Sequence, residues 1–225
     1  MQRFFDIFFS TFSILALLPL LIPIIIFLKL TGEGEVFYRQ DRIGMNGKVF
    51  KLFKFATMLK DSPNMTNGTI TVRNDPRVLP AGKFLRKTKI NELPQLLNIL
   101  FGDMSIIGPR PLTVQTFSFY NTQTQKLVRQ VRPGLSGIGS IVFRDEENIL
   151  AGELGSLDFY NQVIAPYKGL LEEWYVKNNS IKTYFKAIFV TLCVVISPDS
   201  TLPWRTFSGL PIPPINLKAY LNYPG

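Results

Sequence analysis

Histidine is absent from this chain of 225 residues, and cysteine occurs once, at Cys193. Without histidine the chain cannot form a Ser-His-Asp triad, a Cys-His nucleophile pair or the usual zinc sites. With one cysteine it cannot form an intramolecular disulfide. A metal ion bound here would therefore be a hard cation held by oxygen ligands, such as Mg²⁺.

Positive charge is plentiful, with a formal net charge of +9. A basic chain favours nucleic acid, anionic lipid headgroups or phosphorylated small molecules as partners. The lysines and arginines are scattered among apolar runs, and no standard nucleic-acid-binding module is visible. We therefore expect no nucleic-acid partner.

The N-terminal segment Ile7–Leu28 contains no charged residue. At about 1.5 Å per residue, a helix of this length could cross a hydrocarbon core of roughly 30 Å. Pro19 and Pro23 lie inside it, and each removes an amide donor and disturbs the preceding turn. Two architectures compete: a kinked single-pass anchor, and a re-entrant helix–break–helix with both ends on one face. The flanking cations Arg3 and Lys29 favour the second, with both ends cytoplasmic.

A β-hairpin is predicted after this segment. Val36–Arg42 and Val49–Phe55 are rich in β-branched and aromatic residues, and Met45-Asn46-Gly47 between them is typical of a turn. Asp61–Gly82 is dense in Asn, Pro and Gly, which indicates a long loop. Loops of this length often carry function.

The following segment has the pattern of an amphipathic helix, with four leucines between Leu93 and Leu100 on one face. Asn91 is a suitable N-cap, Pro94 is tolerated in the first turn, and Gly102 is a suitable end.

Further along, Thr113–Val131 is predicted as one helix and Leu157–Ile196 as two, the second from about Ser180. The proline-rich tail is expected to be irregular. We expect a mostly helical α+β protein with a membrane-embedded N-terminal segment, a small β-hairpin and amphipathic helices that lie in the core or at the membrane interface. Its parts would be a membrane-embedded segment (1–30), a cytoplasmic-face domain (31–196) and the tail (197–225).

Candidate site residues surround the predicted helix start. A helix N-terminus suits phosphate, and Glu92 there could stabilise the dipole, bind Mg²⁺ or act as a base. Plain helix capping is the alternative for Asn91 and Glu92. Arg110 lies between two prolines on a stiff backbone, where a guanidinium can bind a phosphate with two hydrogen bonds; an ordinary surface arginine is the alternative.

Three further cations lie near these elements in the sequence. Arg77 ends the turn Asp75-Pro76-Arg77, where Asp75 could simply cap the turn. Lys54 and Arg86 add positive charge, although a run of basic residues is usually a solvated face. None of these residues or short patterns is specific on its own, but the order in which they occur along the chain is specific.

Several short motifs occur in sequence order. They are Phe5-Asp6-Ile7 and Pro19; Val36-Phe37-Tyr38-Arg39-Gln40-Asp41-Arg42-Ile43-Gly44; Gly47-x-x-Phe50-Lys51-x-Phe53-Lys54-Phe55; Asp75-Pro76-Arg77; Gly82-x-Phe84-Leu85-Arg86-Lys87-Thr88; Glu92-Leu93-Pro94-Gln95-Leu96; Gly102-Asp103-Met104-Ser105; Gly108-Pro109-Arg110-Pro111; Arg132-Pro133-Gly134-Leu135-Ser136-Gly137; and Trp174-Tyr175-Val176. In this order they resemble the bacterial sugar transferases, the small monotopic phosphoglycosyl transferases that act on polyprenyl phosphates. The resemblance extends from Arg3 to about Ile196.

The resemblance implies transfer of a sugar 1-phosphate from a UDP-sugar to undecaprenyl phosphate with release of UMP, the first membrane step of a bacterial surface glycan pathway. It also implies Mg²⁺, a re-entrant N-terminal helix and a location at the cytoplasmic face of the inner membrane. In the family an Asp-Glu dyad precedes Leu-Pro-Gln: the Asp attacks the substrate phosphate to form a covalent intermediate, and the Glu helps to hold Mg²⁺. The Pro-Arg-Pro arginine, Arg110 here, contacts phosphate or nucleotide. Arg77, Arg86 and Lys54 are expected to add phosphate-binding charge.

The chain departs from the family pattern at two positions. Leu18 replaces the Ser beside Pro19, so the break would depend on Pro19 and Pro23 alone. Asn91 stands where the family has the dyad Asp, and an amide cannot form the usual acyl phosphate. Three outcomes are open: Glu92 is the nucleophile; the lipid phosphate attacks directly while Glu92 holds Mg²⁺ and Asn91 orients a phosphate oxygen; or the chain is a catalytically impaired membrane scaffold of a glycan-assembly complex. The sugar and a homodimeric state are also open.

Overall fold

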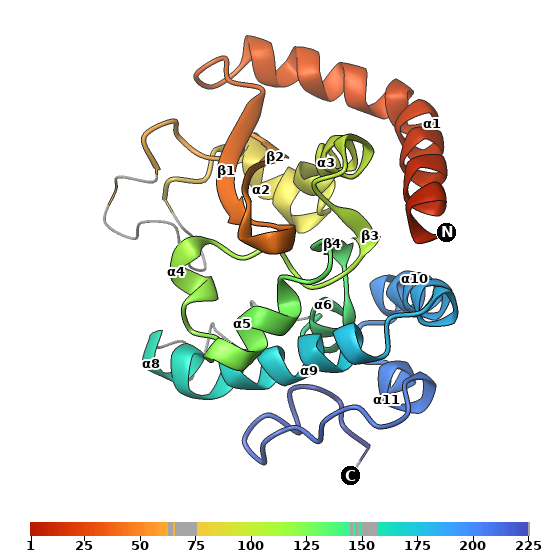
Figure 1. Ribbon diagram of the computed structural model, residues 1–225. Coiled ribbons are helices and arrows are strands. Elements are labelled where there is room, and N and C mark those ends of the chain that lie inside the picture. The colour runs from red at the N-terminus through yellow and green to blue at the C-terminus, as the bar shows by residue number, and fades with distance from the viewer. Residues whose placement is uncertain (63–64, 66–75, 145, 147–148, 150–156, 225) are drawn as a thin grey trace.

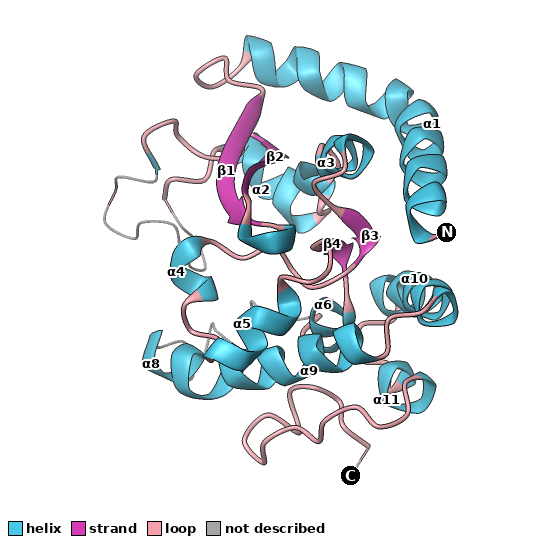
Figure 2. Ribbon diagram, viewed as in Figure 1, coloured by secondary structure: helices cyan, strands magenta, loops and turns pink. Residues whose placement is uncertain are grey.

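The computed structural model describes residues 1–62, 65, 76–144, 146, 149 and 157–224. Most of its regular structure is helical. The helices are α1 (Gln2–Leu30), α2 (Pro80–Lys87), α3 (Gln95–Phe101), α4 (Val114–Phe117), α5 (Thr122–Val128), α6 (Ile138–Val142), α8 (Leu157–Phe159), α9 (Ala165–Lys177), α10 (Ile181–Ile196) and α11 (Leu202–Thr206). The strands are β1 (Phe37–Ile43), β2 (Val49–Phe55), β3 (Ser105–Ile107) and β4 (Gly134–Ser136). Figure 2 shows the small amount of sheet among these helices, which confirms the mostly helical α+β class.

The apolar N-terminal segment forms the single long helix α1, and both prolines lie inside it. Each proline removes one amide donor and crowds the preceding turn, which bends a helix without necessarily ending it. Figure 1 shows the axis of α1 bent part-way along its length. The helix is long and apolar enough to cross a membrane, and only 6% of its most apolar stretch is buried. The predicted break into two separate helices is therefore replaced by a bend.

A polar N-terminal turn attaches α1 to the rest of the fold. Asp6 is 1% exposed, and its Oδ1 accepts hydrogen bonds from Ser105 Oγ and the Ile106 amide on β3, each at 2.9 Å. The same oxygen accepts a third bond from the Tyr184 hydroxyl on α10, also at 2.9 Å. Arg3 donates to two carbonyls at the C-terminal end of α3. The base of the apolar helix is thus bonded to the strand that leads to Arg110.

The predicted hairpin is confirmed. β1 and β2 pair antiparallel, from Phe37 opposite Phe55 to Ile43 opposite Val49. A 3₁₀ turn joins them, and Asn46 and Gly47 adopt positive φ values of 58° and 75°. The Asn-Gly pair supplies this left-handed backbone, which is why the sequence located the turn correctly.

The region around Asn91 differs from the prediction. Ile90–Glu92 forms a 3₁₀ turn, η3, and α3 begins only at Gln95 with Pro94 as its N-cap residue. Pro94 has no amide to bond back to the Ile90 carbonyl, so the first turns use shorter three-residue spacing, as in the Leu93 N to Ile90 O bond. Asn91 is therefore not the N-cap of α3. Gly102 does end α3, with φ of 97°.

Two other helix boundaries differ. The predicted single helix over Thr113–Val131 is divided into α4 and α5 because Asn121 begins a new helix, accepting a hydrogen bond from the Thr124 amide at 2.8 Å. The predicted loop over Asp61–Gly82 ends early, because Pro80 takes the first position of α2. Most of that loop, including Asp75, lies outside the described residues.

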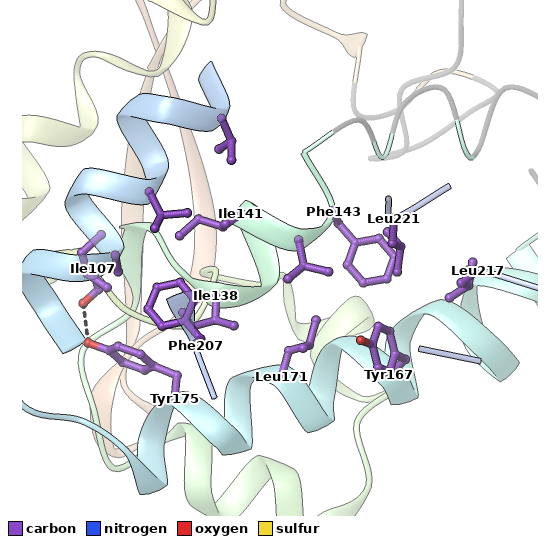
Figure 3. Packing of buried hydrophobic residues seen from close by; sticks show 14 of the residues in the cluster. Ile107, Ile138, Ile141, Phe143, Tyr167, Leu171, Tyr175, Phe207, Leu217 and Leu221 are labelled. Atoms are coloured by element: carbon purple, nitrogen blue, oxygen red, sulfur yellow. Dashed lines mark hydrogen bonds between the residues drawn. The ribbon is translucent and has the colours of Figure 1, made fainter. Parts of the chain in front are cut away.

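The C-terminal half packs around α9. A π-helical turn, η4 (Tyr160–Ile164), joins α8 to α9. α10 begins where the sequence predicts, and Ser180 caps it. The core between α9, α10, α6 and β3 is apolar, and Figure 3 shows the Tyr175 hydroxyl bonded to the Ile107 carbonyl at 2.9 Å inside it. The tail belongs to this core, since Phe207 and Leu217 are at most 3% exposed. The outer face of α10 exposes apolar side chains, Phe185, Phe189, Leu192, Val195 and Ile196 among them.

Candidate active site

The loop that carries Arg110 is held by direct backbone contacts between β3 and β4, which pair in parallel. The Gly134 amide donates to the Pro109 carbonyl at 2.8 Å, and the Gly108 amide donates to the Ser136 carbonyl at 2.9 Å. A Cβ on Gly134 would lie 2.1 Å from Gly108 N, and one on Gly137 would lie 2.0 Å from Gly108 O. These glycines therefore allow two backbones to approach closely enough to fix the loop.

Glu92 extends from η3 toward this loop and meets two cations. Lys54 on β2 lies 3.0 Å from Glu92 Oε1 and donates a hydrogen bond to it. Arg110 Nη2 lies 3.9 Å from the same oxygen. The Glu92 and Lys54 side chains are 21% and 19% exposed, and that of Arg110 is 41% exposed. The hairpin, η3 and the loop after β3 thus converge on one carboxylate.

The two cations keep Glu92 ionised. Burial alone would raise the pKa of Glu92, but the charges of Lys54 and Arg110 outweigh it and hold that pKa at about 2. Burial also lowers the pKa of Lys54, against the opposing effect of Glu92. At neutral pH the site therefore contains a carboxylate paired with ammonium and guanidinium groups.

Arg42 adds a third cation. Burial and the charge of Arg110 lower the pKa of Arg42 to about 10, while Glu92 opposes this shift. Its guanidinium donates to the Pro111 carbonyl at 3.0 Å and to Gln40. A small open pocket is lined by Arg42, Lys54, Glu92 and Arg110, together with Leu52, Gln95, Pro111, Gly134 and Leu135. Three cations around one carboxylate give the pocket a net positive charge, which suits a phosphorylated ligand.

Asn91 lies beside this pocket in sequence and is 6% exposed. Its Oδ1 is buried and has no hydrogen-bond partner in the described part of the chain. A buried acceptor without a donor is costly, and a bound cation or ligand donor would remove that cost. Asn91 does not line the pocket, so Glu92 is the one acidic oxygen ligand in the pocket lining that could hold Mg²⁺, an ion that commonly takes one or two protein carboxylates and completes its shell with phosphate and water. No group of three or more acidic, histidine or cysteine ligands occurs among the described residues. Any Mg²⁺ bound here would therefore depend on the substrate for further ligands.

The structure separates the other predicted phosphate-binding residues from this pocket. Arg77 is 5% exposed and donates to the Ser62 carbonyl at 2.8 Å, and it does not line the pocket. Arg86 lies in the last turn of α2 and does not line it either. Of the predicted cations, Lys54 and Arg110 are the two brought to Glu92.

Sequence reasoning missed two pocket residues. Arg42 and Gln95 both lie within motifs noted above, but nothing in their spacing indicated that they face Glu92. For Arg42 the available signal was its place on the predicted hairpin strand opposite the one that carries Lys54.

Comparison with known proteins shows the family of this chain. Residues 1–198 match the family model described as bacterial sugar transferase. The chain belongs to the bacterial sugar transferase family. It is 36% identical over 195 residues to the UDP-glucose:undecaprenyl-phosphate glucose-1-phosphate transferase of Escherichia coli K12, an alignment that covers 84% of this chain and 39% of that protein.

Two further relatives are similar to this bacterial sugar transferase over different shares of their length. The exopolysaccharide production protein ExoY of Rhizobium meliloti is 36% identical over 159 residues, which are 64% of this chain and 70% of that protein. The galactosyl transferase CpsE of Streptococcus agalactiae is 34% identical over 173 residues, 72% of this chain and 35% of that protein. The chain thus spans well under half the length of the named glucosyl and galactosyl relatives. It is a sugar-1-phosphate transferase family enzyme, and its described residues include one helix suited to membrane association.

Proposed function

We propose that this chain transfers a sugar 1-phosphate from a UDP-sugar to undecaprenyl phosphate and releases UMP. The observation that carries the proposal is the Glu92 carboxylate held between Lys54 and Arg110 in a pocket with excess positive charge. A pyrophosphate is the part of a UDP-sugar that such a pocket would bind. The name of the Escherichia coli relative, a UDP-glucose:undecaprenyl-phosphate glucose-1-phosphate transferase, supplies the substrate class.

In the reaction proposed, an oxygen of undecaprenyl phosphate forms a bond to the β-phosphorus of the UDP-sugar. The bond from that phosphorus to the bridging oxygen breaks, and UMP leaves with the electron pair. Such phosphoryl transfers depend mainly on positioning and on neutralising charge. Lys54 and Arg110 would hold the phosphate oxygens and offset that charge, and a Mg²⁺ held by Glu92 would neutralise pyrophosphate charge further.

This direct route is supported by the state of the two dyad positions. The Asn91 amide cannot form an acyl phosphate, and Glu92 is tied to Lys54 with a pKa of about 2, which makes its carboxylate a weak nucleophile. The alternative is a two-step route in which Glu92 attacks first. Intact mass spectrometry after incubation with a UDP-sugar alone separates them: an adduct on Glu92 would support the two-step route.

The bent, apolar α1 would place this site at a membrane. We propose that residues 1–30 enter the inner membrane in a re-entrant manner with both ends at the cytoplasmic face, that 31–196 form the transferase domain, and that 197–225 pack onto it. The bend in α1, a helix that contains both prolines, and the polar bonds at its base support this arrangement. The apolar outer face of α10 would lie against the same surface.

The test is UMP release by the purified protein with undecaprenyl phosphate, Mg²⁺ and a panel of UDP-sugars. The panel includes UDP-glucose and UDP-galactose, because one relative is named as a glucose-1-phosphate transferase and another as a galactosyl transferase. We expect release with at least one sugar, and only when lipid phosphate and Mg²⁺ are both present.

A second candidate function follows from Asn91 itself. A chain that lacks the dyad carboxylate could serve as a catalytically impaired membrane scaffold of a glycan-assembly complex. This candidate predicts no UMP release with any UDP-sugar, even after Asn91→Asp. UMP release by the wild type or by Asn91→Asp would show that the pocket can work as a catalytic site, and would contradict this scaffold candidate.

A further inference from the structure

A buried carboxylate lies directly behind the Arg110 loop. Glu172 on α9 is 1% exposed, and its Oε1 accepts a hydrogen bond from the Arg110 backbone amide at 3.4 Å. Because Pro109 and Pro111 have no amide hydrogen, Arg110 supplies the one backbone donor of this tripeptide. The partner of that donor therefore has a direct influence on how the loop is held.

The chain keeps this carboxylate at a cost. Glu172 Oε2 is buried and has no hydrogen-bond partner in the described residues. Burial raises the pKa of Glu172 to about 7, although the bond from the Arg110 backbone and the charge of Lys168 oppose this. A buried acid of this kind contributes little to stability, and an apolar side chain of similar volume often replaces one without loss. Its presence therefore needs a reason other than packing.

The neighbours of Glu172 are arranged around it. A Cβ on Gly139 of α6 would lie 2.4 Å from Glu172 Oε1, so the glycine leaves space for the carboxylate. Lys168, one turn earlier on α9, is 4% exposed and is paired with Glu146 at 2.7 Å. The Lys168 charge is thus shared with another carboxylate, whereas Glu172 bonds the loop.

We propose that Glu172 is a positioning residue for the transfer reaction: it bonds the Arg110 amide and thereby holds the Arg110 guanidinium over Glu92, where the substrate phosphate would bind. The inference rests on the proposed function, in which Arg110 contacts that phosphate. Glu172 does not itself reach the pocket, since it is absent from the residues that line it. Its effect on activity would pass through Arg110.

The test compares two substitutions at Glu172 in the full chain. Glu172→Gln keeps an oxygen that can accept the Arg110 amide bond, whereas Glu172→Met keeps the volume and loses the bond. We expect Glu172→Gln to stay within about threefold of wild-type kcat and Glu172→Met to lose on the order of 10²-fold, comparable to loss of one electrostatic contact. The apparent melting temperature of Glu172→Met should match or exceed that of the wild type.

Glu173→Met is the matched control. Glu173 is the next residue on α9 and is 7% exposed, but it bonds Thr124 on α5 and Lys177 instead of the loop. We expect Glu173→Met to leave kcat near the wild-type value. An equal loss of activity in both variants, or a lowered melting temperature that accounts for the loss in Glu172→Met, would show that Glu172 is merely structural.

A double-mutant cycle shows whether the effect passes through Arg110. In an Arg110→Ala background, Glu172→Met should cause little further loss of UMP release, or of the affinity for UDP measured in the presence of Mg²⁺. The reason is that the guanidinium that Glu172 positions is already gone. If the enzyme is active and the fold losses of UMP release caused by Arg110→Ala and Glu172→Met multiply in the double variant, the inference is overturned and the proposed function stays intact. A wild type that neither releases UMP nor binds UDP would overturn both.

Discussion

Replacing Lys54 with methionine should change how stability depends on pH, because Lys54 is the cation nearest to Glu92. The pair is separated by 3.0 Å, and its side chains are 19% and 21% exposed. The gap between an ordinary Glu pKa of 4.5 and the value of about 2 in the folded protein corresponds to about 3 kcal/mol of stability, most of which depends on the cations. We therefore expect Lys54→Met to lower the free energy of unfolding at pH 7 by less than this amount, because Arg110 remains beside Glu92 and the burial cost of the Lys54 ammonium is removed.

The sign of the pH effect follows from the direction of this shift. Because the pKa of Glu92 is lower in the folded than in the unfolded protein, its contribution is present above about pH 4.5 and is lost as the pH falls toward 2. At pH 4 the wild type should have lost about 1 kcal/mol of it. In Lys54→Met the nearest cation no longer outweighs the effect of burial, so the pKa of Glu92 rises. Glu92 then contributes less stability at pH 7, and the variant loses less stability on acidification. The stability difference between the two proteins should narrow on acidification.

The assay is the apparent melting temperature of both proteins in the same detergent at pH 7, 5.5 and 4. If the stability difference between wild type and variant narrows by about 1 kcal/mol, the gap between their melting temperatures should shrink by about 2 to 4 °C for a chain of this size. Lys51→Met is the control, because Lys51 pairs with Asp41 on the exposed face of the same hairpin, with 60% and 53% exposure. A difference that stays constant or widens at low pH would refute the assigned role of Lys54.

Three further substitutions have distinct expected outcomes. Arg110→Ala should lower the rate of UMP release by about 10²-fold, and an unchanged rate would remove Arg110 from the site. Gly134→Ala should cost about 1 to 3 kcal/mol or prevent folding, because its Cβ would lie 2.1 Å from Gly108 N; a wild-type melting temperature would contradict the close approach of β3 and β4. Asp6→Leu should lower the melting temperature through loss of three buried hydrogen bonds at the base of α1, whereas Tyr184→Phe, which removes one of them, should cost less.

Local backbone chemistry made part of the fold predictable from sequence. The Asn46-Gly47 turn, the end of α3 at Gly102 and the start of α10 at Ser180 each depend on one or two residues with a strong conformational preference. The start of α3 was predicted incorrectly because Pro94 was treated as a first-turn residue of a longer helix, although its missing amide sets the boundary.

The site was predictable only to the extent that motifs indicated it. Glu92, Lys54 and Arg110 were named from the sequence, but their convergence depends on how the hairpin, η3 and the loop after β3 pack together. Nothing local distinguished them from Arg77 and Arg86, which do not line the pocket. Glu172 carries no local signal either, since its burial is set by the packing of α9 against α6.

The most direct test of the account is UMP release by the wild type and by Glu92→Gln in the same lipid nanodiscs, with undecaprenyl phosphate, Mg²⁺ and the preferred UDP-sugar. We expect the wild type to release UMP and Glu92→Gln to remain at background while its circular dichroism and elution volume match those of the wild type. Turnover by Glu92→Gln at the wild-type rate would contradict the placement of the reaction at this carboxylate.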